Sequence, residues 1–91
     1  MFSVVYTESY VKKAKKFIKH HPELLSQYEK TLKLLEINPL HPSLRLHKLK
    51  GKLKHLWSIS INLNYRISLE FFIEKEKIIL VNIGSHSDVY S

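Results

Sequence analysis

The sequence predicts an α+β fold, in which an antiparallel sheet of about four strands carries a hairpin of two helices on one face. Two segments in the first half of the chain repeat apolar residues at helical spacing, whereas the second half alternates apolar and polar residues. A short apolar run precedes both helices. The resulting order, β-α-α-β-β-β, is typical of domains whose helices gather on one side of a sheet.

The first half of the chain accounts for one strand and both helices. Residues 2–6 are β-branched and aromatic, which is typical of a strand. Thr7 can cap the next helix, whose apolar stripe runs through residues 10–18. Pro22 ends that helix, because the residue before a proline disfavours helical geometry, and it suits the start of a second helix with an apolar stripe over residues 24–35. So short a turn predicts that the two helices pack antiparallel.

The second half predicts three strands. Residues 57–63 and 65–73 alternate apolar and polar side chains, and the Asn62-Leu63-Asn64 connection between them is typical of a hairpin turn. Residues 77–83 are apolar on both faces, which predicts a central strand. Arg66 alternates with the apolar side chains of its strand, so we expect it on the sheet face that the helices leave open.

Composition limits the class of protein. We expect one domain over residues 1–91, because this length suits a single small core and no linker or repeat divides it. The absence of cysteine excludes disulfides and thiolate metal sites. No apolar run approaches the ~20 residues of a membrane span, and the first residues lack the charged leader of a signal peptide. We therefore expect a cytoplasmic protein without a membrane partner.

The chain is strongly basic. Fifteen Lys and Arg residues oppose eight Asp and Glu residues, which gives a formal net charge of +7. A dense run of these cations lies in residues 45–55, together with two histidines. Such charge attracts phosphate or carboxylate groups, so we expect a nucleic-acid partner or an acidic protein partner.

Residue spacing excludes several kinds of catalytic site. The six histidines include no pair four residues apart, and the carboxylates are scattered among lysines, so we expect no metal and no other cofactor. Gly51 alone cannot form a phosphate-binding loop, and Ser85-His86 lacks the turn motif that surrounds a serine nucleophile. What remains is metal-free chemistry on a phosphodiester.

Metal-free RNA cleavage needs a base for the 2′-hydroxyl, a cation for the crowded phosphorus and an acid for the leaving oxygen. Histidine suits both proton steps, arginine holds a phosphate with two donors, and tyrosine donates a proton or stacks on a base. The candidates for these roles are His47, His86, Arg66 and Tyr90, and the candidates for binding RNA phosphates are Lys48, Lys50, Lys52 and Lys54.

Structural alternatives stand beside these roles. His86 can be a solvated tail residue, and Tyr90 can fold back onto the core. Arg66 can pair with Glu70 on the sheet surface, and the lysines of residues 48–54 can form a solvated face.

Three segments together resemble the RelE/YafQ-type toxins of bacterial toxin–antitoxin systems. They are the Leu-Lys-Gly loop with the Trp-Ser-Ile strand in residues 47–59, the Tyr-Arg-Ile strand start in residues 64–67, and the Gly-x-His-x-x-Val-Tyr tail in residues 83–90. The resemblance implies a ribosome-dependent mRNA endonuclease that cuts codons in the ribosomal A site and leaves a 2′,3′-cyclic phosphate. It also implies a cognate antitoxin protein as partner, through which alone the toxin would reach operator DNA.

The resemblance also implies roles for residues. Arg66 matches the phosphate-stabilising arginine, His86 the tail histidine that acts as acid or base, Tyr90 the terminal aromatic on the cut base, and His47 the loop histidine. We favour His86 as the acid, with His47 or a lysine as the base. The lysines that match the family's basic loop are Lys50, Lys52 and Lys54.

Two departures from the family pattern leave other functions open. Asn64 stands where the YafQ-like branch has an aspartate, and His86 stands where the RelE branch has an arginine. One rival is a ParE-like inhibitor of DNA gyrase without RNase activity, although such chains generally lack the histidine and tyrosine of the tail. Another is a non-catalytic nucleic-acid-binding module that uses the basic loop for phosphates.

Overall fold

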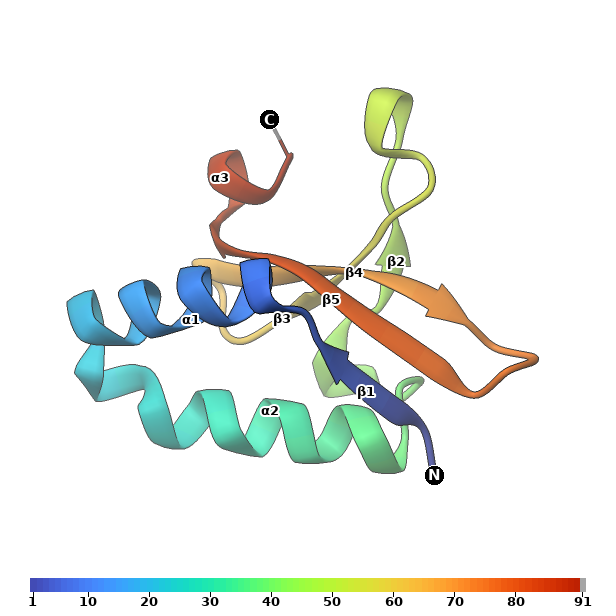
Figure 1. Ribbon diagram of the computed structural model, residues 1–91, viewed down its shortest axis with the longest axis horizontal. Helices are drawn as coiled ribbons and strands as arrows, with labels where there is room; N and C mark the ends of the chain where they lie inside the picture. The colour runs from blue at the N-terminus through green and yellow to red at the C-terminus, as the bar shows by residue number, and fades with distance from the viewer. Residues whose placement is uncertain (91) are drawn as a thin grey trace.

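The computed structural model describes residues 1–90 and confirms the predicted α+β class. Helices α1 and α2 form an antiparallel hairpin that packs on one face of a five-stranded sheet, and the short helix α3 lies on the opposite side (Figure 1). The strands are β1 (Ser3–Tyr6), β2 (His47–Lys48), β3 (Trp57–Ser60), β4 (Tyr65–Phe72) and β5 (Lys77–Ser85), and the helices are α1 (Glu8–His20), α2 (Leu25–Ile37) and α3 (His86–Tyr90).

The helical hairpin begins and turns where the sequence predicts. The Thr7 hydroxyl accepts a hydrogen bond from the backbone N–H of Tyr10 at 3.2 Å and so caps α1. Pro22 occupies the first position of the 3₁₀ turn η1 (Pro22–Leu24), which leads directly into α2. The apolar side of α1 buries Tyr10, Ala14 and Phe17 against the sheet.

The sheet has the order β1-β5-β4-β3-β2 and differs from the predicted one in two details. β1 runs parallel to β5, with Ser3 opposite Lys77 and Tyr6 opposite Leu80, whereas the other pairs are antiparallel. Parallel neighbours need a long connection, and here the chain between β1 and β5 contains both helices and strands β2 to β4. β2 adds a fifth strand of two residues, too short to leave a periodic pattern in the sequence.

The predicted central position of β5 is confirmed for its first half only. β1 ends opposite Leu80, so residues 81–85 of β5 have no strand on the side away from β4. The backbone N–H groups on this open edge donate to side chains instead. Ile83 donates to Asn82 Oδ1 at 2.9 Å, and Ser85 donates to Asp88 Oδ2 at 3.0 Å.

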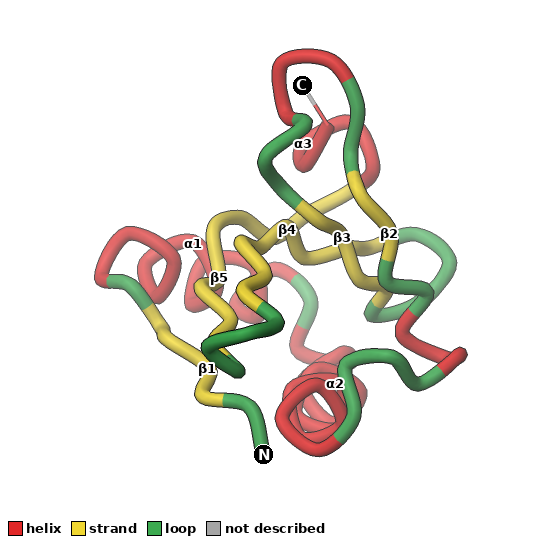
Figure 2. Tube along the Cα trace, turned by 90° about the vertical axis from the view of Figure 1, so that its right-hand side faces the viewer, coloured by secondary structure: helices red, strands yellow, loops and turns green. Residues whose placement is uncertain are grey.

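The core lies between the helical hairpin and the sheet. Helix α2 lies below the sheet (Figure 2). Ile59, Ile67 and Leu69 supply the sheet side of the core, and Leu35 of α2 belongs to the same buried cluster. Tyr10 is buried there with its hydroxyl 2.8 Å from that of Tyr28, and burial raises the pKa of the Tyr10 phenol. Within residues 1–90, α1 and α2 are too short and too polar to cross a bilayer, and so is α3.

Candidate active site

His47 and Tyr90 come from distant parts of the chain and are joined by a hydrogen bond. Nε2 of His47 on β2 lies 2.8 Å from the hydroxyl of Tyr90 on α3. Nδ1 of His47 lies 2.9 Å from the backbone oxygen of Arg45. Because a carbonyl oxygen only accepts, Nδ1 carries the proton, and Nε2 of neutral His47 accepts from the Tyr90 hydroxyl. Nε2 is therefore the basic nitrogen of this imidazole.

His86 completes a cluster of three rings. It precedes Tyr90 by four residues, so both side chains lie on one face of α3, and their ring centroids are 4.0 Å apart. His86 is exposed, whereas Tyr90 is half-buried. His86 is thus solvated, as the alternative of a solvated tail residue expects, but it opens a helix that packs on β4 and β5.

A small hydrogen-bonded turn holds α3 in place. Asp88 Oδ2 accepts from the backbone N–H of Ser85 at 3.0 Å and from its hydroxyl at 2.9 Å. These two hydrogen bonds, from the backbone first and the side chain second, lower the pKa of the Asp88 carboxyl. Asn82 Nδ2 donates to the backbone oxygen of Asp88 at 3.2 Å. The turn therefore fixes where His86 and Tyr90 point.

Gly84 allows this turn to close. Its φ of +157° is one that other residues rarely adopt, and a Cβ there would lie 2.8 Å from Cβ of Asp88. Sequence reasoning missed the roles of both Gly84 and Asp88. The Ser85-x-x-Asp88 spacing, which is that of a helix-capping pair, was the signal that could have identified them.

Arg66 lies on the same side of the sheet as α3, because it alternates with the core residue Ile67. In the sheet it stands opposite Gly84 of β5 and Ser60 of β3, and one terminal nitrogen of its guanidinium donates to the Ser60 hydroxyl. No ion pair joins it to Glu70 in residues 1–90, so that alternative is wrong.

The face around Arg66 is less open than expected. Arg66 is half-buried, and the neighbouring hydroxyls of Ser58 and Ser68 are buried. Those two hydroxyls and Nε of Arg66 have no hydrogen-bond partner within the part of the chain that the structure describes. Unsatisfied buried polar atoms are rare. Here one of them belongs to the guanidinium of Arg66, and the other two are hydroxyls near it.

The basic segment forms an arm beside α3. It runs from β2 through the 3₁₀ turn η3 (Gly51–Leu53) and rises next to α3 on the side of the sheet away from α2 (Figures 1 and 2). Lys48, Lys50, Lys52 and Lys54 are all exposed on it. Lys48 and Lys50, together with His47 and Tyr90, line a pocket of about 310 Å³, whereas Lys52 and Lys54 do not.

The cluster contains the groups that proton transfer on a phosphodiester needs. His47 presents a basic nitrogen, His86 a second imidazole, and Lys48 and Lys50 supply positive charge beside them. Across residues 1–90, no group of three or more histidine and carboxylate side chains gathers in a way that could hold a metal ion.

Comparison with known proteins gives a family match over nearly the whole chain. Residues 2–91 match the model of the family described as bacterial toxin of type II toxin–antitoxin system, YafQ. A comparison with curated protein sequences finds no match.

Solved structures share the fold. The crystal structure of YafQ from E. coli strain BL21(DE3) has a TM-score of 0.80 at 15% identity, with 100% of each chain covered. A structure of the E. coli DinJ–YafQ complex gives 0.78 at 15% identity, also over 100% of each chain. A metal-bound toxin from Helicobacter pylori gives 0.77 at 24% identity, over 99% of this chain and 100% of that one.

Proposed function

Because the chain belongs to the YafQ family of toxins of bacterial type II toxin–antitoxin systems, we propose that it is a metal-independent, ribosome-dependent mRNA endonuclease. The observation that carries this proposal is the cluster of His47, Tyr90 and His86 on the same side of the sheet as Arg66. In this proposal residues 1–91 are one toxin domain that acts in the cytoplasm and uses no membrane partner.

His47 is the general base in this mechanism. Its Nδ1–H is held by the backbone oxygen of Arg45, which leaves Nε2 as the proton acceptor. The 2′-hydroxyl of the RNA takes the place of the Tyr90 hydroxyl at Nε2 and loses its proton to it. The freed 2′-oxygen then attacks the adjacent phosphorus.

Arg66 neutralises the charge that develops on the phosphorus. One terminal nitrogen of its guanidinium donates to the Ser60 hydroxyl, and no hydrogen bond within residues 1–90 uses the other terminal nitrogen. A guanidinium with unused donors can hold two phosphate oxygens at once, and a half-buried position strengthens that attraction. Lys48 and Lys50 bind the neighbouring phosphates from the arm, and Lys52 and Lys54 act further along it.

His86 is the general acid. As the bond from phosphorus to the 5′-oxygen breaks, protonated His86 gives its proton to that oxygen, and the products are a 2′,3′-cyclic phosphate and a 5′-hydroxyl. Tyr90 holds both imidazoles in place before the RNA binds, because its hydroxyl reaches His47 and its ring packs on His86. After its hydroxyl is displaced, the ring can stack on the base beside the cut.

The partner that restrains this activity is a cognate antitoxin protein. The E. coli relative is solved as a DinJ–YafQ complex, and the family is defined by toxin–antitoxin systems. In our proposal the antitoxin neutralises this chain by direct binding, and operator DNA is contacted only through the antitoxin.

The test is expression of the protein without its antitoxin. We expect growth to stop, and primer extension on translated messages to reveal cuts inside codons. His86→Ala and Arg66→Ala should each abolish the cuts, whereas His55→Ala, an exposed histidine with no role in the mechanism, should leave them. In an assay that replaces the ribosome with a suitable RNA mimic, cleavage by the toxin should persist in EDTA.

Two results would overturn the proposal. Intact messages together with accumulating cleaved gyrase–DNA complexes would assign the chain to the ParE-like reading. Full toxicity of both His86→Ala and Arg66→Ala, with folded protein in each case, would remove the active site described above.

A further inference from the structure

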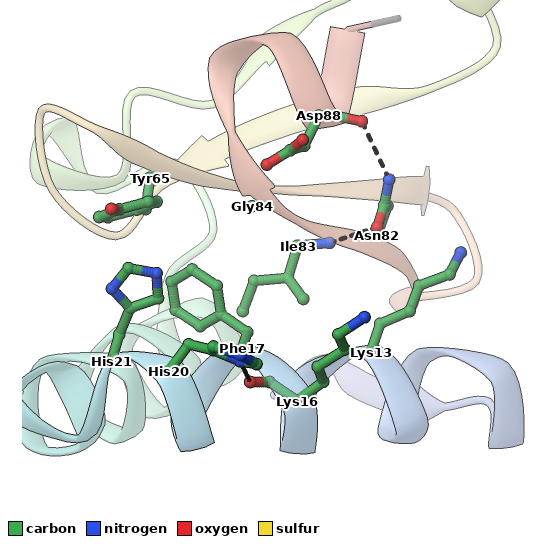
Figure 3. Close-up of a pocket in the computed structure, with 10 residues that line it drawn as sticks. All are labelled: Lys13, Lys16, Phe17, His20, His21, Tyr65, Asn82, Ile83, Gly84 and Asp88. Carbon is green, nitrogen blue, oxygen red and sulfur yellow. Dashed lines mark hydrogen bonds between the residues drawn. The ribbon is translucent and has the colours of Figure 1, made fainter.

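A second groove lies on the other side of α3. It measures about 420 Å³ and is bounded by α1 below, by the open edge of β5 behind, and by the turn into α3 above (Figure 3). It shares no lining residue with the pocket of His47 and Tyr90.

One wall of this groove is cationic. Lys13 and Lys16 of α1 line it, and His20 lies one turn further along the same helix (Figure 3). No carboxylate within residues 1–90 forms an ion pair with any lysine of α1. Their charge is therefore not engaged in an ion pair, and it is available to an anionic ligand.

The end of the groove is aromatic. The rings of His21 and Tyr65 lie 4.7 Å apart between centroids, and Phe17 packs on both, at 4.7 Å from His21 and 5.1 Å from Tyr65. His21 and Tyr65 are half-buried, whereas Phe17 is buried beneath them. This cluster of tilted and edge-to-face rings presents aromatic surface next to the lysines.

We propose that this groove binds one nucleotide of single-stranded RNA, with its base against His21 and Tyr65 and its phosphates on Lys13 and Lys16. Aromatic rings beside a positively charged track are the means by which proteins hold single strands without reading their sequence. The inference rests on the proposed endonuclease function and adds a second contact for its substrate, away from the cut.

The sheet connects the two sites. Tyr65 and Arg66 are neighbours on β4 and point to opposite faces, and they stand opposite Ser85 and Gly84 of β5. A strand of RNA held at Arg66 can therefore pass around the free end of the sheet, alongside α3, and reach the ring of Tyr65 on the other face.

The acidic residue of the groove sets the orientation of the nucleotide. Asp88 lies on the α3 side, where its carboxylate is held by the backbone and hydroxyl of Ser85. Its charge repels phosphate, so the phosphates lie along the α1 wall. The base, which carries no charge, takes the space toward His21.

The test compares two double variants of one helix. Lys13→Gln/Lys16→Gln removes the lysines of the groove, and Lys15→Gln/Lys19→Gln removes two that line a different surface, with the same loss of charge. Binding of a labelled 2′-O-methyl RNA oligonucleotide, which cannot be cleaved, is followed by fluorescence anisotropy at several salt concentrations. Circular dichroism confirms that each variant is folded.

In the groove variant the slope of log affinity against log salt should become less steep by about 1.4, because each of the two lost phosphate contacts to a single strand contributes about 0.7. The control should retain the slope of the wild-type protein. His21→Ala should weaken binding about fivefold or more, because it removes a stacking surface.

Three outcomes would overturn the proposal that the groove binds RNA. An equal loss of RNA affinity in both double variants would mean that net charge alone accounts for binding. Unchanged RNA affinity together with weakened antitoxin binding would assign the surface to an acidic protein. If the protein bound no RNA even at concentrations above ~10⁻⁴ M, the weak end of dissociation constants for non-specific binding, the proposed RNA contact would be excluded. Codon cleavage, tested with His86→Ala, is scored separately, so the groove and the endonuclease proposal can fail independently.

Discussion

At the scale of single residues, the site depends on which atom of His47 carries the proton. The backbone oxygen of Arg45 holds the proton on Nδ1, and the hydroxyl of Tyr90 marks the position of Nε2. The chemistry of these residue types was predictable from the sequence, because an imidazole transfers protons near neutral pH, a guanidinium holds a phosphate, and a phenol donates a proton or stacks on a base. Their contact was not, because His47 and Tyr90 are 43 residues apart.

Substitutions of His47 and Tyr90 should distinguish the role of His47 as base from the role of Tyr90 as its hydrogen-bond partner. His47→Gln removes the base, so the rate of RNA cleavage should fall about 10²- to 10⁴-fold. Tyr90→Phe keeps the ring and removes one hydrogen bond, which is worth about 1 kcal/mol, so the rate should fall only about fivefold. Single-turnover cleavage of RNA measures both. A larger loss for Tyr90→Phe than for His47→Gln would make the phenol the main proton acceptor.

At the scale of elements, α3 is the structural unit that creates the site. Five residues cannot form a stable helix alone, so its position depends on the Ser85–Asp88 turn and on packing against β4 and β5. Sequence periodicity cannot detect a helix of this length. For this reason the prediction ended with a strand at residue 83, whereas β5 continues to Ser85 and α3 follows at once.

Gly84→Ala should displace α3 while the rest of the fold persists. The added Cβ would lie 2.8 Å from Asp88 Cβ, so the turn must open and carry His86 and Tyr90 away. A misplacement of about 1 Å can reduce a rate by about 10²-fold, and we expect a loss of this size in RNA cleavage. Amide NMR shifts of residues 85–90 should change with it.

Gly51→Ala is the matched control for this change. Gly51 also has a positive φ, of +66°, but no atom lies within 4 Å of its added Cβ. The cost is backbone strain of about 1–2 kcal/mol in the basic arm, and the NMR shifts of α3 should stay as in the wild-type protein. If Gly51→Ala moved those shifts as much as Gly84→Ala does, the close contact at Asp88 would not be what positions α3.

At the scale of the whole molecule, a core of modest size supports the active site on the opposite face of the sheet. A 91-residue domain has little stability in reserve, so loss of core packing should remove activity through unfolding. Leu35 is fully buried beneath the sheet, whereas Leu63 in the β3–β4 turn is 74% exposed.

Leu35→Ala should lower the free energy of unfolding by about 2–5 kcal/mol, because it leaves a cavity in the core. Each kcal/mol lowers Tm by about 4–8 °C in a domain of this size. Leu63→Ala should change the stability by less than about 0.5 kcal/mol. Thermal melts followed by circular dichroism measure both, and similar melting temperatures would contradict the position of the core.

The sequence by itself determined the order of the longer elements, the ends of the helical hairpin and the kinds of chemistry available, because periodicity, caps and prolines act over a few neighbouring residues. Only the tertiary structure decided that β1 lies parallel to β5, that Lys48 and Lys50 rather than Lys52 and Lys54 line the pocket, and that α3 brings Tyr90 to His47. These features depend on strand register and on turns such as that at Gly84, where residues far apart in the chain must fit together in space.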